Sequence, residues 1–418
     1  MKSAACIAAA LLAACASAAF AQQQKVSPPI ATYWMSIDTT SGMPMGGGGG
    51  VSMMDIGRMV MGGGAGGGAG NRTLLLELGS QRSASGIPAA AHDIPPGLRM
   101  GASLPLETPQ RARRSEPRED GMPENFEKPR GRMLIFWGCG EQAGAGQPFV
   151  IDFAKLAQGQ MPQGLTGRRV SVQSGPSFAR SRTYGDWPNP RDSTRVSGEG
   201  SLRGEHVVKG NYSPDIRFSL SERYDFMEPV QLSMRKAGGG GMNLAWQSIP
   251  NAHGYFASAM GGNDRTEDVV FWSSSTTREF GEVLMNWLPP SEVARLAREK
   301  VVMPTSTTEC TVPAQFVAAA PSAFVRFIAY GEEANFVHPP RPQDPKVDWN
   351  PEWAVKVRLK STAAAMLGEE GMAGAEAPRS RGRAESPAPQ EGAPQSAPSP
   401  AADAVKEGLK ALRGLFGR

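Results

Sequence analysis

The stretch at residues 353–360, WAVKVRLK, alternates apolar side chains with cationic ones, apart from Ala354 at one polar position. Neighbouring side chains of a β-strand point to opposite faces, so the apolar members would share one face and Lys356, Arg358 and Lys360 the other. Residues 216–220 and 230–235 alternate in the same way. Burial on one face alone is typical of antiparallel sheets. The chain is therefore predicted to be mainly β.

Further segments add strands and one helix to this pattern. Residues 31–37, 73–78 and 133–137 are predicted strands, and residues 149–156 are predicted to begin as a strand and end as a helix. Pro289-Pro290-Ser291 starts the clearest helix, whose apolar residues share one face. We expect two β-sandwich-like regions, residues 22–205 and residues 206–366, with this helix inserted in the second.

The second region resembles a fibronectin type III domain across residues 212–361. Residues 244–255 (LAWQSIPNAHGY) are similar to its B-strand tryptophan and C-strand tyrosine, and residues 324–331 (FVRFIAYG) to its F strand. Residues 353–359 would be its last strand. The resemblance implies two facing sheets, although the helix and Cys310 between Trp272 and Thr311 depart from a plain module.

The whole chain also resembles a group of exported proteins of Gram-negative bacteria. The shared stretches are GCGE at residues 138–141 and NPEW at residues 350–353. That group has no assigned activity, so the resemblance implies a compartment and no chemistry.

Residues 1–21 are predicted to be a cleaved signal peptide. Lys2 precedes an apolar run at residues 4–14, and Ala19-Phe20-Ala21 supplies the small-x-small pattern of a cleavage site. The run is shorter than the roughly 20 residues that span a bilayer. Lipidation of Cys15, which follows Leu12-Ala13-Ala14, is the alternative. Either outcome places the protein in the periplasm or cell envelope, or outside the cell.

Three segments have compositions typical of disorder: the Gly/Met-rich residues 42–70, the Arg/Glu/Pro-rich residues 109–132 and the Ala/Pro-rich residues 367–401. Residues 402–418 regain helical spacing, with Val405, Leu409, Leu412 and Phe416 on one face. We expect a short amphipathic helix there. It could lie on a membrane surface as a peripheral contact, or dock into a groove of a partner protein.

Cys139 and Cys310 are the two cysteines outside the signal region. In an oxidising compartment we expect them to form a disulfide. The alternative is a pair of buried free thiols.

The sequence carries no motif of a common catalytic site. The four histidines (His92, His206, His253 and His338) lack zinc-ligand spacing and are expected on loops or the surface. Neither a Gly-x-Ser-x-Gly elbow nor a phosphate-binding loop occurs. The formal charge of +4 is small and dispersed, which argues against a nucleic-acid partner.

Methionines supply a metal hypothesis. Six lie within the Gly-rich insert: Met43, Met45, Met53, Met54, Met59 and Met61. Thioether sulfur suits copper(I), and a flexible loop could wrap the ion. The alternative is a low-complexity loop whose methionines pack loosely or contact a partner.

The leading functional hypothesis is an exported, non-enzymatic protein that binds an envelope protein or a glycan through its sandwich loops and needs no cofactor. It follows from the export signal, the fold class and the missing catalytic motifs. The alternatives are a periplasmic copper(I)-handling protein and an envelope hydrolase whose site is assembled from distant residues.

Overall fold

The computed structural model describes residues 24–42, 70–109, 131–160, 162, 170–263, 266–279, 281–367 and 371–373. The predicted signal peptide and the C-terminal amphipathic helix lie outside these residues, as do nearly all of the predicted disordered segments 42–70, 109–132 and 367–401. Within the last segment, Gly371–Ala373 form a short strand that pairs with residues 232–234, so the prediction of disorder is wrong for these three residues.

Seventeen strands and several short helices make up the described part. The strands are β1 (Ala31–Gly42), β2 (Asn71–Ser80), β3 (Ala90–Asp93), β4 (Ser103–Leu106), β5 (Arg132–Trp137), β6 (Phe149–Asp152), β7 (Thr183–Trp187), β8 (Gly204–Gly210), β9 (Ile216–Leu220), β10 (Leu232–Lys236), β11 (Met242–Ala245), β12 (Gly254–Asn263), β13 (Asp268–Ser273), β14 (Glu309–Val312), β15 (Phe324–His338), β16 (Trp353–Met366) and β17 (Gly371–Ala373). The helices are α2 (Phe153–Ala157), α3 (Gly281–Leu284), α4 (Pro290–Arg298) and α5 (Ala314–Ala319), with 3-10 turns at Pro96–Leu98 and Glu222–Tyr224.

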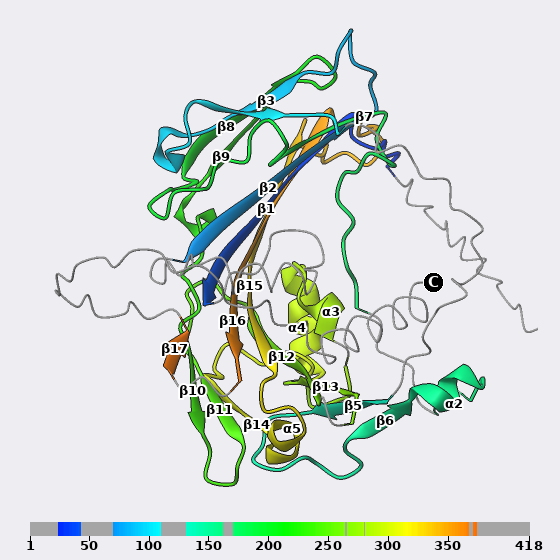
Figure 1. The fold of residues 1–418 in the computed structure, drawn as a ribbon. Helices are drawn as coiled ribbons and strands as arrows, with labels where there is room; N and C mark the ends of the chain where they lie inside the picture. The colour runs from blue at the N-terminus through cyan, green and yellow to red at the C-terminus, as the bar shows by residue number, and fades with distance from the viewer. Residues whose placement is uncertain are drawn as a thin grey trace, which may run out of the picture.

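A nine-stranded sheet runs through the molecule in the order β6-β5-β13-β12-β15-β16-β1-β2-β7 (Figure 1). Its longest strands, β15 and β16, pair antiparallel at its centre. β1 pairs parallel with β16, and β5 pairs parallel with β13. Segments from opposite ends of the sequence therefore lie side by side in the middle of the sheet.

Two four-stranded sheets pack on one face of this large sheet, one towards each end (Figure 1). Their orders are β4-β3-β8-β9 and β14-β11-β10-β17. Both contribute to one hydrophobic core with the large sheet, as Phe218, Leu244 and Val357 illustrate. On the opposite face, α3, α4 and the segments that follow them cover β12 and β15, where Leu296 packs with Phe256 and Ile328. The large sheet is thus buried on one face along most of its strands and covered by helices on part of the other.

The predicted mainly β class is confirmed, as are the strand at residues 216–220 and the helix that starts at residues 289–291. The division between residues 205 and 206 differs from what is seen, because it falls inside β8, which pairs with β3 of the N-terminal region. The large sheet also takes strands from both predicted regions. Alternation specifies which face of a strand is buried, but it carries no information about a partner strand three hundred residues away.

The predicted disulfide between Cys139 and Cys310 is present. Cys139 follows β5 in the large sheet and Cys310 lies in β14 of a small sheet. Their Cα atoms lie 5.1 Å apart. The cross-link therefore ties two sheets of the fold together.

Replacing Cys139 and Cys310 together by serine is expected to lower the free energy of unfolding by about 2–5 kcal/mol, because a long closed loop is released in the unfolded chain. The loop spans 171 residues. Urea unfolding measures the difference. Dithiothreitol should destabilise the wild type and leave the double variant unchanged. A wild type that is equally stable in the reductant would contradict the prediction.

Two histidines expected on the surface are buried between the large sheet and the β4-β3-β8-β9 sheet. His92 and His206 both have 0% exposure. His206 Nε2 lies 2.7 Å from the Leu202 carbonyl, so this nitrogen must carry the proton that is donated. His206 Nδ1 then accepts from His92 Nε2 at 3.0 Å, and His92 Nδ1 accepts from the Tyr33 hydroxyl at 2.9 Å. Hydrogen bonding therefore fixes one neutral tautomer for each ring.

Burial also keeps both histidine rings neutral. It lowers the pKa of His92 well below the usual value, helped by His206, and it lowers the pKa of His206 as well. Phe218 stacks on His206 with a centroid distance of 5.0 Å. The histidines serve as satisfied core residues here, and their neutral state is part of the fold.

The free energy of unfolding is expected to fall as pH drops below about 6.5, where unfolded histidine begins to take up a proton. The folded state resists that proton, so each buried ring adds a slope of up to about 1.4 kcal/mol per pH unit. Above that pH the contribution is complete and constant. Urea unfolding across this pH range measures the effect. In the His92→Leu/His206→Leu variant, the free energy of unfolding should depend less steeply on pH than in the wild type. His338→Leu, at an exposed ring, is the control and should keep the wild-type slope.

Candidate functional site

The polar face of β1 and β16 carries the most unusual group of side chains in the described structure. The parallel register pairs Trp34 with Lys356, Ser36 with Arg358 and Asp38 with Lys360. The intervening residues, Tyr33, Met35 and Ile37, lie in the hydrophobic core with 0% exposure. Period-two alternation therefore places three cations and a tryptophan in line on the face that the two small sheets do not cover.

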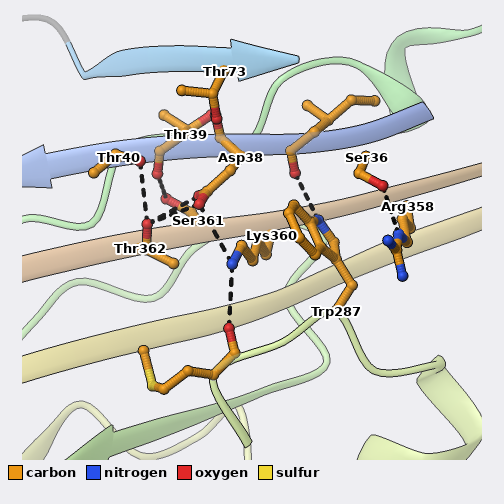
Figure 2. Close-up of polar contacts among 12 residues, drawn as sticks. Ser36, Asp38, Thr39, Thr40, Thr73, Trp287, Arg358, Lys360, Ser361 and Thr362 are labelled. Carbon is orange, nitrogen blue, oxygen red and sulfur yellow. Dashed lines mark hydrogen bonds and ion pairs between the residues drawn. The ribbon is translucent and has the colours of Figure 1, made fainter. Parts of the chain in front are cut away.

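The three cations alternate with two indole rings. Trp34 has the Arg358 guanidinium at 4.5 Å and the Lys356 ammonium at 5.7 Å from its centroid. Trp287, which follows α3, has Arg358 at 4.8 Å and the Lys360 ammonium at 4.0 Å. The Trp287 ring is held by a 3.0 Å hydrogen bond from Nε1 to the Ile37 carbonyl (Figure 2). We name this row of five side chains the cation–π row.

The outer cations of the row have acidic partners. Lys356 Nζ contacts the Glu333 carboxylate and donates to Asn335 Oδ1 at 2.8 Å. Lys360 Nζ lies 3.6 Å from Asp38 Oδ2 and donates to the Met285 carbonyl at 3.2 Å (Figure 2). Two of the three charges are therefore balanced locally.

Arg358, in the middle, is different. Its Nε donates to Ser36 Oγ at 2.7 Å. Across the described residues, no other hydrogen bond and no carboxylate within 4.0 Å belong to its guanidinium. Burial lowers the pKa of Arg358 to about 10, against the opposing effect of Glu77 and Glu333. The guanidinium therefore stays charged at neutral pH.

Asp38 and Lys360 form a buried pair at the inner end of the row. Asp38 accepts from Thr362 Oγ1 at 3.0 and 3.1 Å (Figure 2). Burial raises the pKa of Asp38, while Lys360 and Thr362 act in the opposite direction. Burial also lowers the pKa of Lys360, and Asp38 opposes that change. Each partner thus offsets part of the other's desolvation.

At the outer end, the cation–π row opens into a groove of about 300 Å³. Its floor is a line of small side chains across three strands, Thr32, Ala354 and Val337, which the register places side by side. Trp349, from the segment between β15 and β16, and Trp34 also line the groove. We name it the Trp349 groove.

Trp349 is fixed in place by its neighbours. Its indole Nε1 donates to the Pro339 carbonyl at 3.0 Å. Its backbone bonds to the N-terminal segment, from Trp349 N to the Lys25 carbonyl at 2.8 Å and from Ser27 N to the Trp349 carbonyl at 2.9 Å. Trp34 is only 6% exposed, so Trp349 offers the larger aromatic surface to a ligand.

The segment before β7 lies against Trp34. A Cβ atom on Gly175 would come within 2.7 Å of the Trp34 ring, so only glycine permits this approach. Beyond it, Tyr184 donates to Glu77 Oε1 at 3.3 Å, and burial raises the pKa of Glu77. Acidic groups thus lie on the β2 side of the row, while the Trp349 groove lies at its outer end.

This arrangement suits binding better than catalysis. Ligand sites are concave, mostly apolar and carry a few placed polar groups, as the Trp349 groove does with Asn335, Lys356 and Thr32. Within the described residues, no group of three His, Cys, Asp or Glu could hold a metal ion. The copper candidates Met43, Met45, Met53, Met54, Met59 and Met61, and Cys15, lie outside the described residues.

No pattern in the sequence marks these site residues as a group. Only the alternation at residues 353–360 pointed to one face with Lys356, Arg358 and Lys360 on it. Trp34 and Trp287 carried no signal of proximity, because they lie more than 60 residues from β16 and from each other. Pairing of β1 with β16 creates the site.

Single changes at Asp38 or Lys360 are expected to destabilise the fold by about 3–5 kcal/mol, because each leaves an uncompensated buried charge. Lys360→Met and Asp38→Leu separately should lower the free energy of unfolding, and the double variant should recover most of the loss. The exposed pair Lys209 and Asp93, at 2.8 Å, is the matched control. Its single variants should change stability by less than about 1 kcal/mol. Equal losses at both pairs, by urea unfolding, would contradict this account.

None of the helices among the described residues has the length and apolar character needed to cross a membrane. The chain matches no protein-family model, no curated protein and no solved structure. Its function must therefore be argued from the cation–π row and the Trp349 groove.

Proposed function

We propose that this chain is an exported, non-enzymatic protein of the cell envelope that binds a glycan in the Trp349 groove. The observation that carries the proposal is the groove itself, which joins an oriented tryptophan to a floor of small side chains and a few polar groups. The export part rests on the signal-like residues 1–21 and agrees with a disulfide that suits an oxidising compartment.

The resemblance of residues 212–361 to a fibronectin type III domain would support a binding role by fold-level analogy. Strands β14, β11 and β10 belong to one sheet and strands β13, β12, β15 and β16 to another, and both sheets contribute to one core. Trp246 follows β11, and its ring lies 4.6 Å from that of Phe327 and 5.6 Å from that of Tyr255. The two residues of the resemblance, Trp246 and Tyr255, thus belong to one aromatic cluster between those sheets.

Size favours a glycan over a folded protein as the occupant. A groove of about 300 Å³ lies at the small end of ligand pockets, whereas a stable protein interface buries on the order of 1,200 Å² or more. An indole face packs against the C–H surface of a sugar ring. Hydroxyl groups of the sugar would find partners in Asn335, Lys356 and Thr32. A terminal sugar unit or a short segment of a chain fits these dimensions.

Contacts within the chain itself orient the main aromatic surface of the groove, which strengthens the proposal. Backbone bonds to Lys25 and Ser27 and the indole bond to Pro339 hold Trp349 in place. A ligand would not have to order this side chain, and that lowers the free-energy cost of binding.

The mature protein is expected to bind members of an oligosaccharide array. Trp349→Ala should weaken that binding by about 30-fold, which is a typical loss when a tryptophan at the centre of a binding site is removed. Titration calorimetry with the best oligosaccharide measures the loss. Ile87→Ala is the control, because Ile87 is 88% exposed in the β2–β3 connection and does not line the groove.

Two results would overturn the proposal. One is a wild-type protein that binds no oligosaccharide. The other is a Trp349→Ala variant that is folded, by circular dichroism, and binds as tightly as the wild type and Ile87→Ala.

A further inference from the structure

Arg358 lies next to the Trp349 groove along β16, and it is the one cation of the row with no carboxylate within 4.0 Å among the described residues. Lys356 lines the groove, and Arg358 is the next residue on the same face of β16. Two residues of an extended strand span about 6.6 Å. A sugar unit in the groove could therefore present a substituent to Arg358 across the edge of Trp34.

The position of the guanidinium limits what it can bind. Its central carbon lies 4.5 Å from the centroid of the Trp34 ring and 4.8 Å from that of the Trp287 ring. Nε is used by Ser36 at 2.7 Å. The edge formed by the two Nη groups makes no hydrogen bond to any described residue. That edge donates parallel N–H groups, the geometry that pairs with a planar oxyanion.

We propose that Arg358 binds the carboxylate of an acidic sugar, so that the protein recognises a uronic-acid-containing glycan. This inference rests on the proposed glycan-binding function. Charge favours a carboxylate over a phosphate monoester, and planar two-point geometry favours it over a tetrahedral sulfate ester. Glu333 and Asp38 already balance the flanking lysines, and Glu77 lies on the β2 side of the row. A guanidinium that no carboxylate of the described residues contacts suits a single negative charge spread over two oxygens.

The flanking lysines cannot take this role. Lys356 is engaged by Glu333 and Asn335, and Lys360 by Asp38 and the Met285 carbonyl. Recruiting either would break an existing ion pair. The two indoles hold the guanidinium rigidly, so little side-chain freedom would be lost when the anion binds.

The test compares matched oligosaccharides that differ only in their carboxyl groups. Oligogalacturonides and their carboxyl-reduced galactose counterparts are titrated into the full mature protein by calorimetry. The wild type should bind the acidic member about 10- to 100-fold more tightly, the effect expected of hydrogen bonds between charged groups. Sulfated counterparts of the neutral member form a second arm and should bind more weakly than the acidic one.

Arg358→Gln should remove the preference for the acidic member while the reduced member binds as before. Arg358→Lys keeps the charge without the two Nη groups and should retain only a small part of the preference. Arg235→Gln, at an exposed arginine on β10, is the control and should behave as the wild type. Circular dichroism establishes whether each variant is folded. If Arg358→Gln does not fold, the loss of preference in Arg358→Lys tests the role of Arg358 instead.

The outcomes separate this inference from the proposed function. A wild type that binds both members equally would overturn the role of Arg358 and leave glycan binding intact. So would a folded Arg358 variant that keeps the full preference, or a wild type that prefers the sulfated member. A protein that binds none of these oligosaccharides and no other member of an array would overturn both.

Discussion

The parallel pairing of β1 with β16 is the constraint on which the rest of the structure depends. It joins residues 31–42 to residues 353–366 in register, so that Ala31 pairs with Trp353 and Gly42 with Ala364. A shift of one residue would turn every side chain of β1 to the other face. Tyr33, Met35 and Ile37 would then leave the core, and Trp34 and Asp38 would enter it without their partners. Register and core composition therefore enforce each other.

The same pairing gives the large sheet two faces with different roles. The face that carries Tyr33 and Val357 belongs to one core shared with both small sheets, so burial of apolar area stabilises the whole assembly. On the other face, the helical segments cover β12 and β15, while β1 and β16 carry charge. The face with the Trp349 groove can therefore carry polar side chains, because the hydrophobic core on the opposite face of the sheet stabilises the fold.

Local patterns in the sequence predicted the strands well and the site poorly, for one physical reason. Periodicity at residues 216–220 and 353–360 reflects the burial of each strand and needs no knowledge of its partner. The division at residue 205 failed because sheet membership depends on long-range pairing, as between β3 and β8. For the same reason His92 and His206 were predicted to be separate surface residues. They lie 114 residues apart in the sequence, but a 3.0 Å hydrogen bond joins their rings in the fold. The disulfide was predictable only because compartment and cysteine number left a single pairing.

Burying the charges of the cation–π row lowers the stability of the fold, and this cost favours a functional role for the row. Charged groups lose hydration when buried, and apolar residues of similar size often replace buried ion pairs without loss of stability. Each stacked cation recovers about 0.5–2 kcal/mol from its indole, and Lys356 and Lys360 recover more from their acids. Arg358 has only the two rings and one serine hydroxyl. Its burial is therefore the least compensated of the three, and an anionic ligand would supply the missing partner. Stacking between Trp34 and Trp287 keeps the guanidinium charged, oriented and beside the groove, which are the conditions under which a single arginine can discriminate one glycan from another.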